Sequence, residues 1–166
     1  MMQSANWNAM PDAARLWVYT ASRDLSDAEC AHVAKSLEAF TASWQAHGKD
    51  LAAAWQLTVG RRVLLLAVDE SGQQATGCSI DASVAFLKTL GAELGDCDWF
   101  DRHIIMYQDA TTAWVSARLH AFWALRKAGV VGSETNVCDA TLQTLGDWNR
   151  QGIAPFDQTW HQHMWS

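Results

Sequence analysis

The chain has 166 residues, of which 49% are hydrophobic and 18% are charged; this composition is typical of one globular domain and excludes an intrinsically disordered protein. Eighteen acidic and twelve basic residues give a formal net charge of −6, and the basic residues are scattered, so we expect no nucleic-acid partner. The longest apolar run, residues 63–68, is far shorter than the roughly 20 residues that a bilayer crossing requires, so we expect no membrane association.

The N-terminal stretch has neither the basic cluster nor the apolar core of a secretory signal, so we expect a cytoplasmic protein. Residues 1–14 are interpreted as a flexible tail, and residues 15–166 as a single domain. The four cysteines form no CxxC pair and are expected to be free thiols: Cys30, Cys78, Cys97 and Cys138. We expect no cofactor and no metal, because His161 and His163 supply only two of the usual four ligands.

The first predicted elements are a strand and a helix with a clear start. Residues 16–20 are aromatic and β-branched, which predicts a strand. Ser26 and Glu29 have the spacing of a capping box, and apolar residues then recur at helical spacing as far as Trp44. Gly48 is the predicted end of this helix.

A hairpin and a second helix are predicted next. Residues 54–59 and 63–68 flank Gly60 and read as two paired strands. The second of these strands is apolar on both faces, so we expect it to lie inside the sheet. After a polar loop, apolar periodicity predicts a helix over residues 80–94.

The C-terminal half repeats this pattern of hairpin and helix. Strands are predicted over residues 103–107 and 113–117, followed by a helix that starts at Leu119 and ends at Gly129. Residues 135–138 predict a further strand, and residues 141–148 a short helix. The order predicts an α+β fold: a single domain with a mostly antiparallel sheet built from β-hairpins, and helices packed on one face.

The chain contains ten tryptophans, an unusually high number. Burial in the core is one explanation, because tryptophan buries a large area and keeps one N–H for a partner. A stacking surface for a ring-shaped ligand or a protein partner is the other. The sequence leaves both open.

One stretch has the form of an ATPase motif. Residues 63–68 are apolar and are followed by Asp69 and Glu70, as in a Walker B strand. Phosphate binding in that class of enzyme also needs a glycine-rich loop with a lysine, and the sequence has no such loop. The sequence therefore argues against ATPase activity.

Cys78 is the main candidate for chemistry, because it lies where a loop leads into a predicted helix. Free backbone N–H groups at a helix N-terminus favour the thiolate form of a cysteine. Gly77 would let a ligand approach the backbone, and Ser79 or Asp81 could cap the helix or orient a neighbour. The alternative is that residues 77–79 form a turn and Cys78 is buried.

A nucleophilic cysteine needs a base and a way to bind its substrate. His47, which follows the first predicted helix, and His161, which lies near the C-terminus, are the candidate bases. Asp101 and Arg102 precede a strand and would either present a charged pair to an anion or form an ordinary salt bridge. Trp160 and His161 complete the candidate ligand-binding residues, which also include Gly77 and Ser79.

Short stretches along the chain carry a resemblance to a known family. They are Trp17-Val18-Tyr19, Trp44-x-x-His47-Gly48, residues 66–70, residues 76–81 with the sequence Thr-Gly-Cys-Ser-Ile-Asp, residues 100–102 and Trp160-His161. In these stretches the chain resembles an uncharacterised family of small bacterial cytosolic proteins whose members are often described as ABC transporter ATPases. The resemblance covers about residues 16–161 and implies a shared fold and a set of candidate positions, but no established activity.

Two functions fit these observations. The first is a small, soluble, non-catalytic binding or accessory protein that recognises a ligand or a protein partner, and the incomplete catalytic set favours it. The second is a thiol-dependent hydrolase or transferase in which Cys78 is the nucleophile, Asp81 the orienting residue and His47 or His161 the base. A homodimer is compatible with both.

Overall fold

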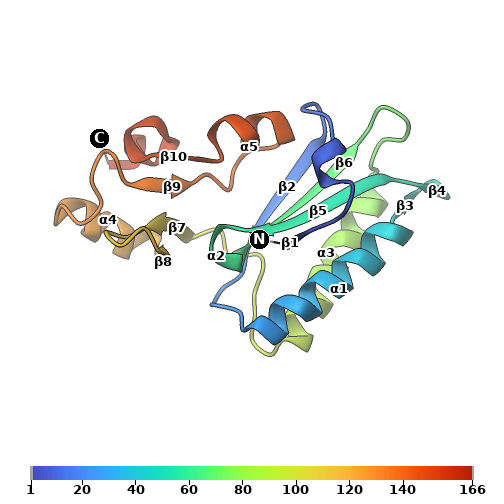
Figure 1. The fold of residues 1–166 in the computed structure, drawn as a ribbon, viewed down its shortest axis with the longest axis horizontal. Helices are drawn as coiled ribbons and strands as arrows, with labels where there is room; N and C mark the ends of the chain where they lie inside the picture. The colour runs from blue at the N-terminus through green and yellow to red at the C-terminus, as the bar shows by residue number, and fades with distance from the viewer. Residues whose placement is uncertain (1, 166) are drawn as a thin grey trace.

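The structure is a computed structural model that describes residues 2–165. Two four-stranded antiparallel sheets, a two-stranded hairpin and five helices build these residues into an α+β fold (Figure 1). The predicted fold class is confirmed. The strands are divided between two sheets, whereas the sequence analysis expected one.

The first sheet has the strand order β1-β5-β6-β2, with every neighbouring pair antiparallel. Its strands are β1 (Met2–Gln3), β5 (Ala52–Thr58), β6 (Val63–Asp69) and β2 (Arg15–Thr20). β6 lies between β5 and β2, as its continuous apolar sequence predicts, because both of its faces are covered.

The stretch that was expected to be a flexible tail is packed on this sheet over its described part, residues 2–14. β1 adds to the edge of β5, where Met2 is opposite Leu57. Trp7, in the short 3₁₀ helix η1 (Trp7–Ala9), is buried at 6% exposure. The expectation overlooked that one tryptophan buries enough apolar surface to hold such a segment in place.

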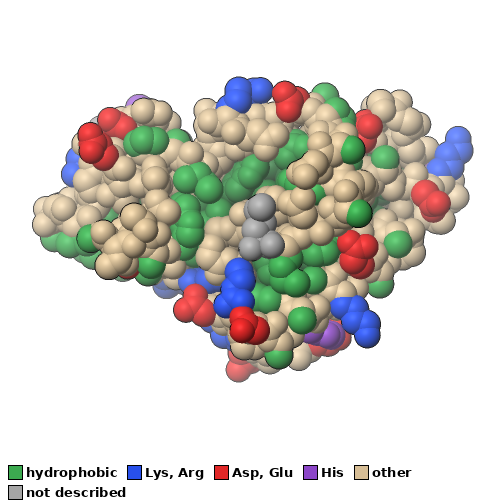
Figure 2. All heavy atoms as spheres, viewed as in Figure 1, with side chains coloured by type: hydrophobic (Ala, Val, Ile, Leu, Met, Phe, Trp, Pro, Cys, Tyr) green, Lys and Arg blue, Asp and Glu red, His purple; other side chains and the backbone are tan. Residues whose placement is uncertain are grey.

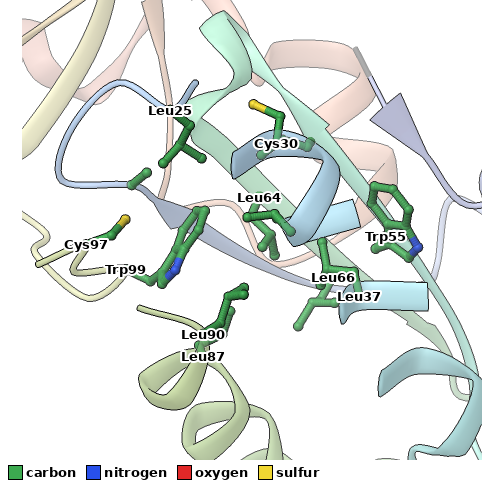
Figure 3. Close-up of a cluster of buried hydrophobic side chains, with 13 residues drawn as sticks. Leu25, Cys30, Leu37, Trp55, Leu64, Leu66, Leu87, Leu90, Cys97 and Trp99 are labelled. Atoms are coloured by element: carbon green, nitrogen blue, oxygen red, sulfur yellow. The ribbon is translucent and has the colours of Figure 1, made fainter. Parts of the chain in front are cut away.

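Helices α1 (Asp27–Ser43) and α3 (Gly77–Glu93) lie side by side on one face of the first sheet (Figure 1). The predicted capping box of α1 is confirmed: Glu29 N donates to Ser26 Oγ at 3.1 Å, and Ser26 N donates to Glu29 Oε1 at 2.9 Å. Leucines from both helices and from the sheet meet between the layers, together with Cys30, Cys97 and two tryptophans (Figure 3).

α1 ends at Ser43, earlier than the predicted end at Gly48. The reason is a tertiary contact, because the buried Trp44 leaves the helix and its Nε1 donates to the carbonyl of Ser79 at 2.8 Å. A small hairpin then follows, made of β3 (Gln45–Ala46) and β4 (Lys49–Asp50).

The second sheet has the order β10-β9-β7-β8 and lies beside the first (Figure 1). Its strands are β10 (Ile153–Pro155), β9 (Asn136–Cys138), β7 (Ile104–Gln108) and β8 (Trp114–Arg118). Helix α4 (Leu119–Lys127) follows β8 and buries Phe122 against the sheet. The predicted second hairpin and third helix are therefore confirmed, and β10 is a strand that the sequence analysis missed.

The last helix, α5 (Leu145–Gln151), begins after Thr144, not at the predicted Thr141. Thr144 Oγ1 accepts from Asp147 N at 3.2 Å and caps the helix. Thr141 is engaged elsewhere, since its hydroxyl donates to Asp139 Oδ1 at 2.5 Å. Two 3₁₀ helices, η2 (Phe156–Gln158) and η3 (Trp160–Trp165), complete the described chain.

The face of the first sheet opposite α1 and α3 packs against the second half of the chain. Met106, Leu145 and Trp148 contribute to this shared core. The hydrophobic side chains visible in the middle of Figure 2 lie where the two sheets meet. Arg62, in the turn α2 (Val59–Arg62) between β5 and β6, adds a polar link, because its Nη1 donates to Ser116 Oγ on β8 at 2.7 Å.

Most tryptophans whose side chains are described serve the core. Five are buried: Trp7, Trp44, Trp55, Trp99 and Trp148. Trp17, Trp114 and Trp123 are half-buried, and Trp160 is exposed. Burial therefore explains most of the tryptophan content. Trp123 and Trp160, which are accessible enough to contact a ligand, both lie in the C-terminal half. Across residues 2–165, no helix combines the length and apolar character that crossing a membrane would need.

Candidate functional site

The predicted thiol site lies in the first turn of α3, which starts three residues before the predicted helix. Thr76 is the N-cap: its Oγ1 accepts from Ser79 N at 3.2 Å, and Ser79 Oγ accepts from Thr76 N at 2.7 Å. Gly77 and Cys78 are thus the first two helical residues. Asp81 lies further into the helix and does not cap it.

Cys78 is exposed, so the alternative that it is a buried core residue is wrong. Asp81 is exposed on the same helix, and His47 is exposed in the turn between β3 and β4. Within residues 2–165, no hydrogen bond or ion pair joins Cys78 to a histidine or to Asp81. Ser79 is buried and its hydroxyl is used in the cap. The structure therefore presents an accessible thiol without an assembled base. The other three cysteines are buried, and all four are free.

Asp101 forms an ion pair with Arg118 and not with its sequence neighbour Arg102. Its carboxylate accepts from His103 N at 2.9 Å and pairs with Arg118 on β8. The hydrogen bond from the His103 backbone and the Arg118 guanidinium hold the pKa of Asp101 below its usual value. Arg102 is exposed and makes no ion pair with Asp101. Asp101 is thus tied into the loop before β7, while Arg102 faces solvent.

Trp160 and His161 meet Asp139, which follows β9. Trp160 Nε1 donates to Asp139 Oδ1 at 3.1 Å, and the Trp160 ring stacks on His161 with the centroids 4.1 Å apart. His161 Nδ1 lies 3.0 Å from Thr159 Oγ1. The spacing of Trp160 and His161 along the chain gave no sign of Asp139, because β9 and η3 are brought together only by the fold.

Burial governs the chemistry of this cluster. His161 is 2% exposed, and its burial lowers its pKa to about 4 despite the opposing effect of the Asp139 charge. Burial also raises the pKa of Cys138, and the Asp139 charge acts in the same direction. At neutral pH, His161 is therefore an uncharged core residue and Cys138 a protonated thiol, so His161, one of the two candidate bases, is shielded from solvent.

A pocket of about 450 Å³ lies between α4 and η2, and its lining differs from the predicted site. α4 supplies Trp123, Arg126 and Lys127, and η2 supplies Phe156 and Asp157. Lys127 Nζ lies 3.7 Å from the centroid of the Trp123 ring, and Arg126 Cζ lies 5.0 Å from the centroid of Phe156.

The comparisons with protein-family models, with curated proteins and with solved structures find no match. The resemblance drawn from the sequence motifs therefore stays an expectation. The described residues, 2–165, also hold no group of three or more His, Cys, Asp or Glu side chains that could bind a metal ion.

The pocket between α4 and η2 has a lining whose charge suits an anion. Two cations and one carboxylate line it, so its local charge is positive on a molecule whose net charge is −6. Arg126 uses Nη1 to donate to the carbonyl of Val131 at 3.3 Å, which leaves its other N–H groups for a ligand. The pair Arg126-Lys127 is visible in the sequence, but Phe156 lies far along the chain and no local pattern connects them.

Proposed function

We propose that this protein is a non-catalytic binding protein that holds a small organic anion, a carboxylate or a phosphate monoester, in the pocket between α4 and η2. One observation carries the proposal: two cations, Arg126 and Lys127, each placed over an aromatic ring, line one pocket of suitable size. Pockets of about 300–1,000 Å³ with aromatic walls and a few charged groups are typical of small-molecule sites.

The aromatic rings restrict the side chains of Arg126 and Lys127 before a ligand binds. A cation over a ring face is attracted by the ring quadrupole and loses part of its rotamer freedom before the ligand arrives. Less side-chain entropy is then lost when an anion binds. The guanidinium of Arg126 also matches the two oxygens of a carboxylate or phosphate.

The negative net charge sets the expected affinity. A chain with a net charge of −6 repels anions at long range, so attraction depends on the two local cations. Asp157, in the pocket wall, opposes the two cations and weakens the attraction for any anion. We therefore expect binding in the micromolar to millimolar range that weakens as salt screens the charges.

The test is calorimetric titration with phenyl phosphate and benzoate, with inorganic phosphate as the ringless probe. The double variant Arg126→Met, Lys127→Met keeps side-chain length and removes both charges. Hydrogen bonds to charged groups contribute about 1.5–3 kcal/mol each, so we expect the affinity to fall by roughly 100-fold or more.

The matched control is Lys35→Met, Lys49→Met, which removes the same charge from two exposed positions outside the pocket. This variant should bind the probes as the parent protein does. Equal affinity in both double variants, or no binding of any probe to the parent protein, would refute the proposal.

Thiol-dependent catalysis at Cys78 is the less supported alternative. The exposure of Cys78 at the start of α3 favours it. The base that the mechanism needs is not placed beside it: within residues 2–165 no hydrogen bond joins His47 to Cys78, and His161 is buried with its ring stacked on Trp160. The geometry therefore supports binding better than catalysis.

A further inference from the structure

We infer that two copies of this chain associate through β8 (Trp114–Arg118), with the two strands antiparallel and Ser116 of one copy opposite Ser116 of the other. β8 is an outer strand of the second sheet (Figure 1). None of its residues lines the anion pocket, so this inference does not depend on the proposed function.

β8 differs from the other three sheet edges, which are blocked. β1 is only two residues long, and the outward N–H of Leu16 on β2 donates to the carbonyl of Gln143 at 2.9 Å. β10 has Pro155 at an outward position, where no N–H is available. Natural proteins use such short strands, covering segments and prolines to prevent sheets from pairing edge to edge. β8 is five residues long, contains no proline, and pairs on its outer side with no other segment of residues 2–165.

The outer edge of β8 carries backbone groups without partners. In an antiparallel pair of strands, the hydrogen bonds join alternate residue pairs. The N–H of Leu119 donates to the carbonyl of His103 at 2.9 Å, so the odd-numbered residues of β8 bond to β7. The N–H and C=O groups of Trp114 and Ser116, and the N–H of Arg118, therefore point away from the sheet. No hydrogen bond within residues 2–165 reaches them, so another strand can add at this edge.

Only one register lets β8 pair with a second β8 along its whole length. Outward residues must face outward residues, and the two strands of a symmetric dimer are related by a two-fold axis. With Ser116 on that axis, every residue of β8 has an opposite residue. Any other register leaves Trp114 or Arg118 without an opposite residue in the strand.

The side chains are complementary in this register. Arg118 of each copy lies opposite Trp114 of the other, where a cation can rest on the face of a ring. The exposed guanidinium of Arg118 pairs with Asp101 and can keep this pair while its flat face contacts the ring. On the other face of the strand, Val115 lies opposite Ala117, and both are half-buried apolar residues. The two Arg118 residues are four residues apart along the strands, about 14 Å at about 3.4 Å per residue, so their repulsion is screened.

Analytical ultracentrifugation of the full chain at micromolar and millimolar concentrations measures the association, and we expect an equilibrium between monomer and dimer. NMR follows individual amides over the same range. The Ser116 amide should exchange with solvent more slowly as the dimer forms, whereas the Ile153 amide, which points out of the blocked β10 edge, should not change. In a mixture of ¹³C-labelled and unlabelled chains, an Hα–Hα NOE between Val115 and Ala117 identifies the register, because the residues of a non-hydrogen-bonded pair approach most closely.

Two substitutions of Arg118 separate the backbone contribution from that of the side chain. The φ of Arg118 is −73°, which suits proline, so Arg118→Pro removes the outward N–H and leaves the hydrogen bonds between β8 and β7 in place. Arg118→Ala is the matched control, because it removes the same side chain and its pair with Asp101 but keeps the N–H. We expect the dissociation constant of the dimer to be at least roughly 10-fold higher for the proline variant than for the alanine variant, since each dimer loses two N–H donors.

The inference is overturned if the parent protein stays monomeric at millimolar concentration, if exchange of the Ser116 amide does not depend on concentration, or if the proline and alanine variants dimerise equally. A dimer without the NOE between Val115 and Ala117 uses another surface or another register and would also overturn it. Sedimentation, amide exchange and the NOE all use the parent chain, so they decide the question even where Arg118→Pro fails to fold.

Discussion

His161 is buried in the C-terminal half although it lies close to the end of the chain. Its folded-state pKa is lowered to about 4, below the value of about 6.5 expected when the chain unfolds. The unfolded state therefore binds more protons between these values, and stability must fall as the pH drops through this window. From pH 7 to about pH 5, we expect His161 to reduce the free energy of unfolding by about 2 kcal/mol.

Urea unfolding of the parent and of His161→Phe at both pH values measures this effect. Phenylalanine does not titrate and keeps a ring for the stack on Trp160. The variant should lose about 2 kcal/mol less than the parent on acidification, whatever its stability at neutral pH. Equal losses in both proteins would show that His161 does not carry the acid sensitivity.

Single residues illustrate what local sequence can and cannot predict. The accessibility of Cys78 depends on its place in the first helical turn, and the sequence left this open. The partners of Trp160 and Arg126 depend on contacts across the fold, namely Asp139 and the ring of Phe156. Residue types indicate which kinds of interaction are possible. Only the tertiary structure determines which residues interact.

At the scale of elements, helix starts differ in how clearly the sequence marks them. α1 was predicted because Ser26 and Glu29 form the common version of the capping box. α3 was predicted to start too late because its box uses Ser79 in place of Glu or Gln, and because Gly77 is a poor helix former. Helix ends are harder still, since the end of α1 is set by the contact between Trp44 and Ser79.

The cap of α3 gives a prediction of its own. Thr76→Ala removes the oxygen that accepts from Ser79 N, and we expect it to reduce the free energy of unfolding by about 1 kcal/mol. Thr76→Ser keeps a hydroxyl and should remain within a few tenths of a kcal/mol of the parent. Chemical denaturation of both variants is the measurement, and equal stabilities of the alanine and serine variants would contradict a capping role.

For the whole molecule, the fold class followed from the order of strands and helices, and the two hairpins formed as predicted. The division into two sheets could not be predicted, because periodicity shows which face of a strand is buried but not which strand covers it. The junction between the two sheets depends on the conformation of the turn between β5 and β6. Gly60 has a φ of 64° there, and a Cβ would lie 2.9 Å from Cβ of Trp114 on β8.

Arg62 is the polar link across this junction and gives the prediction for the whole molecule. Its side chain is buried, Nε and Nη2 donate to the carbonyl of Ala21 at 3.2 and 2.8 Å, and Nη1 donates to Ser116 Oγ. Arg62→Met preserves the apolar stem but leaves these acceptors without their charged donor. We expect a loss of about 3 kcal/mol in the free energy of unfolding, together with faster amide exchange in β7 and β8.

Arg61→Met is the matched control because it removes the same charge from the adjacent position. Arg61 lies on the surface and pairs with the exposed Asp27, and surface pairs of this kind contribute less than about 1 kcal/mol. If the junction depends on Arg62, only its variant will both destabilise the protein and loosen the second sheet. If both variants lose the same small amount, the two sheets are held by the shared apolar core around Met106 and Trp148, and Arg62 contributes no more than a surface residue.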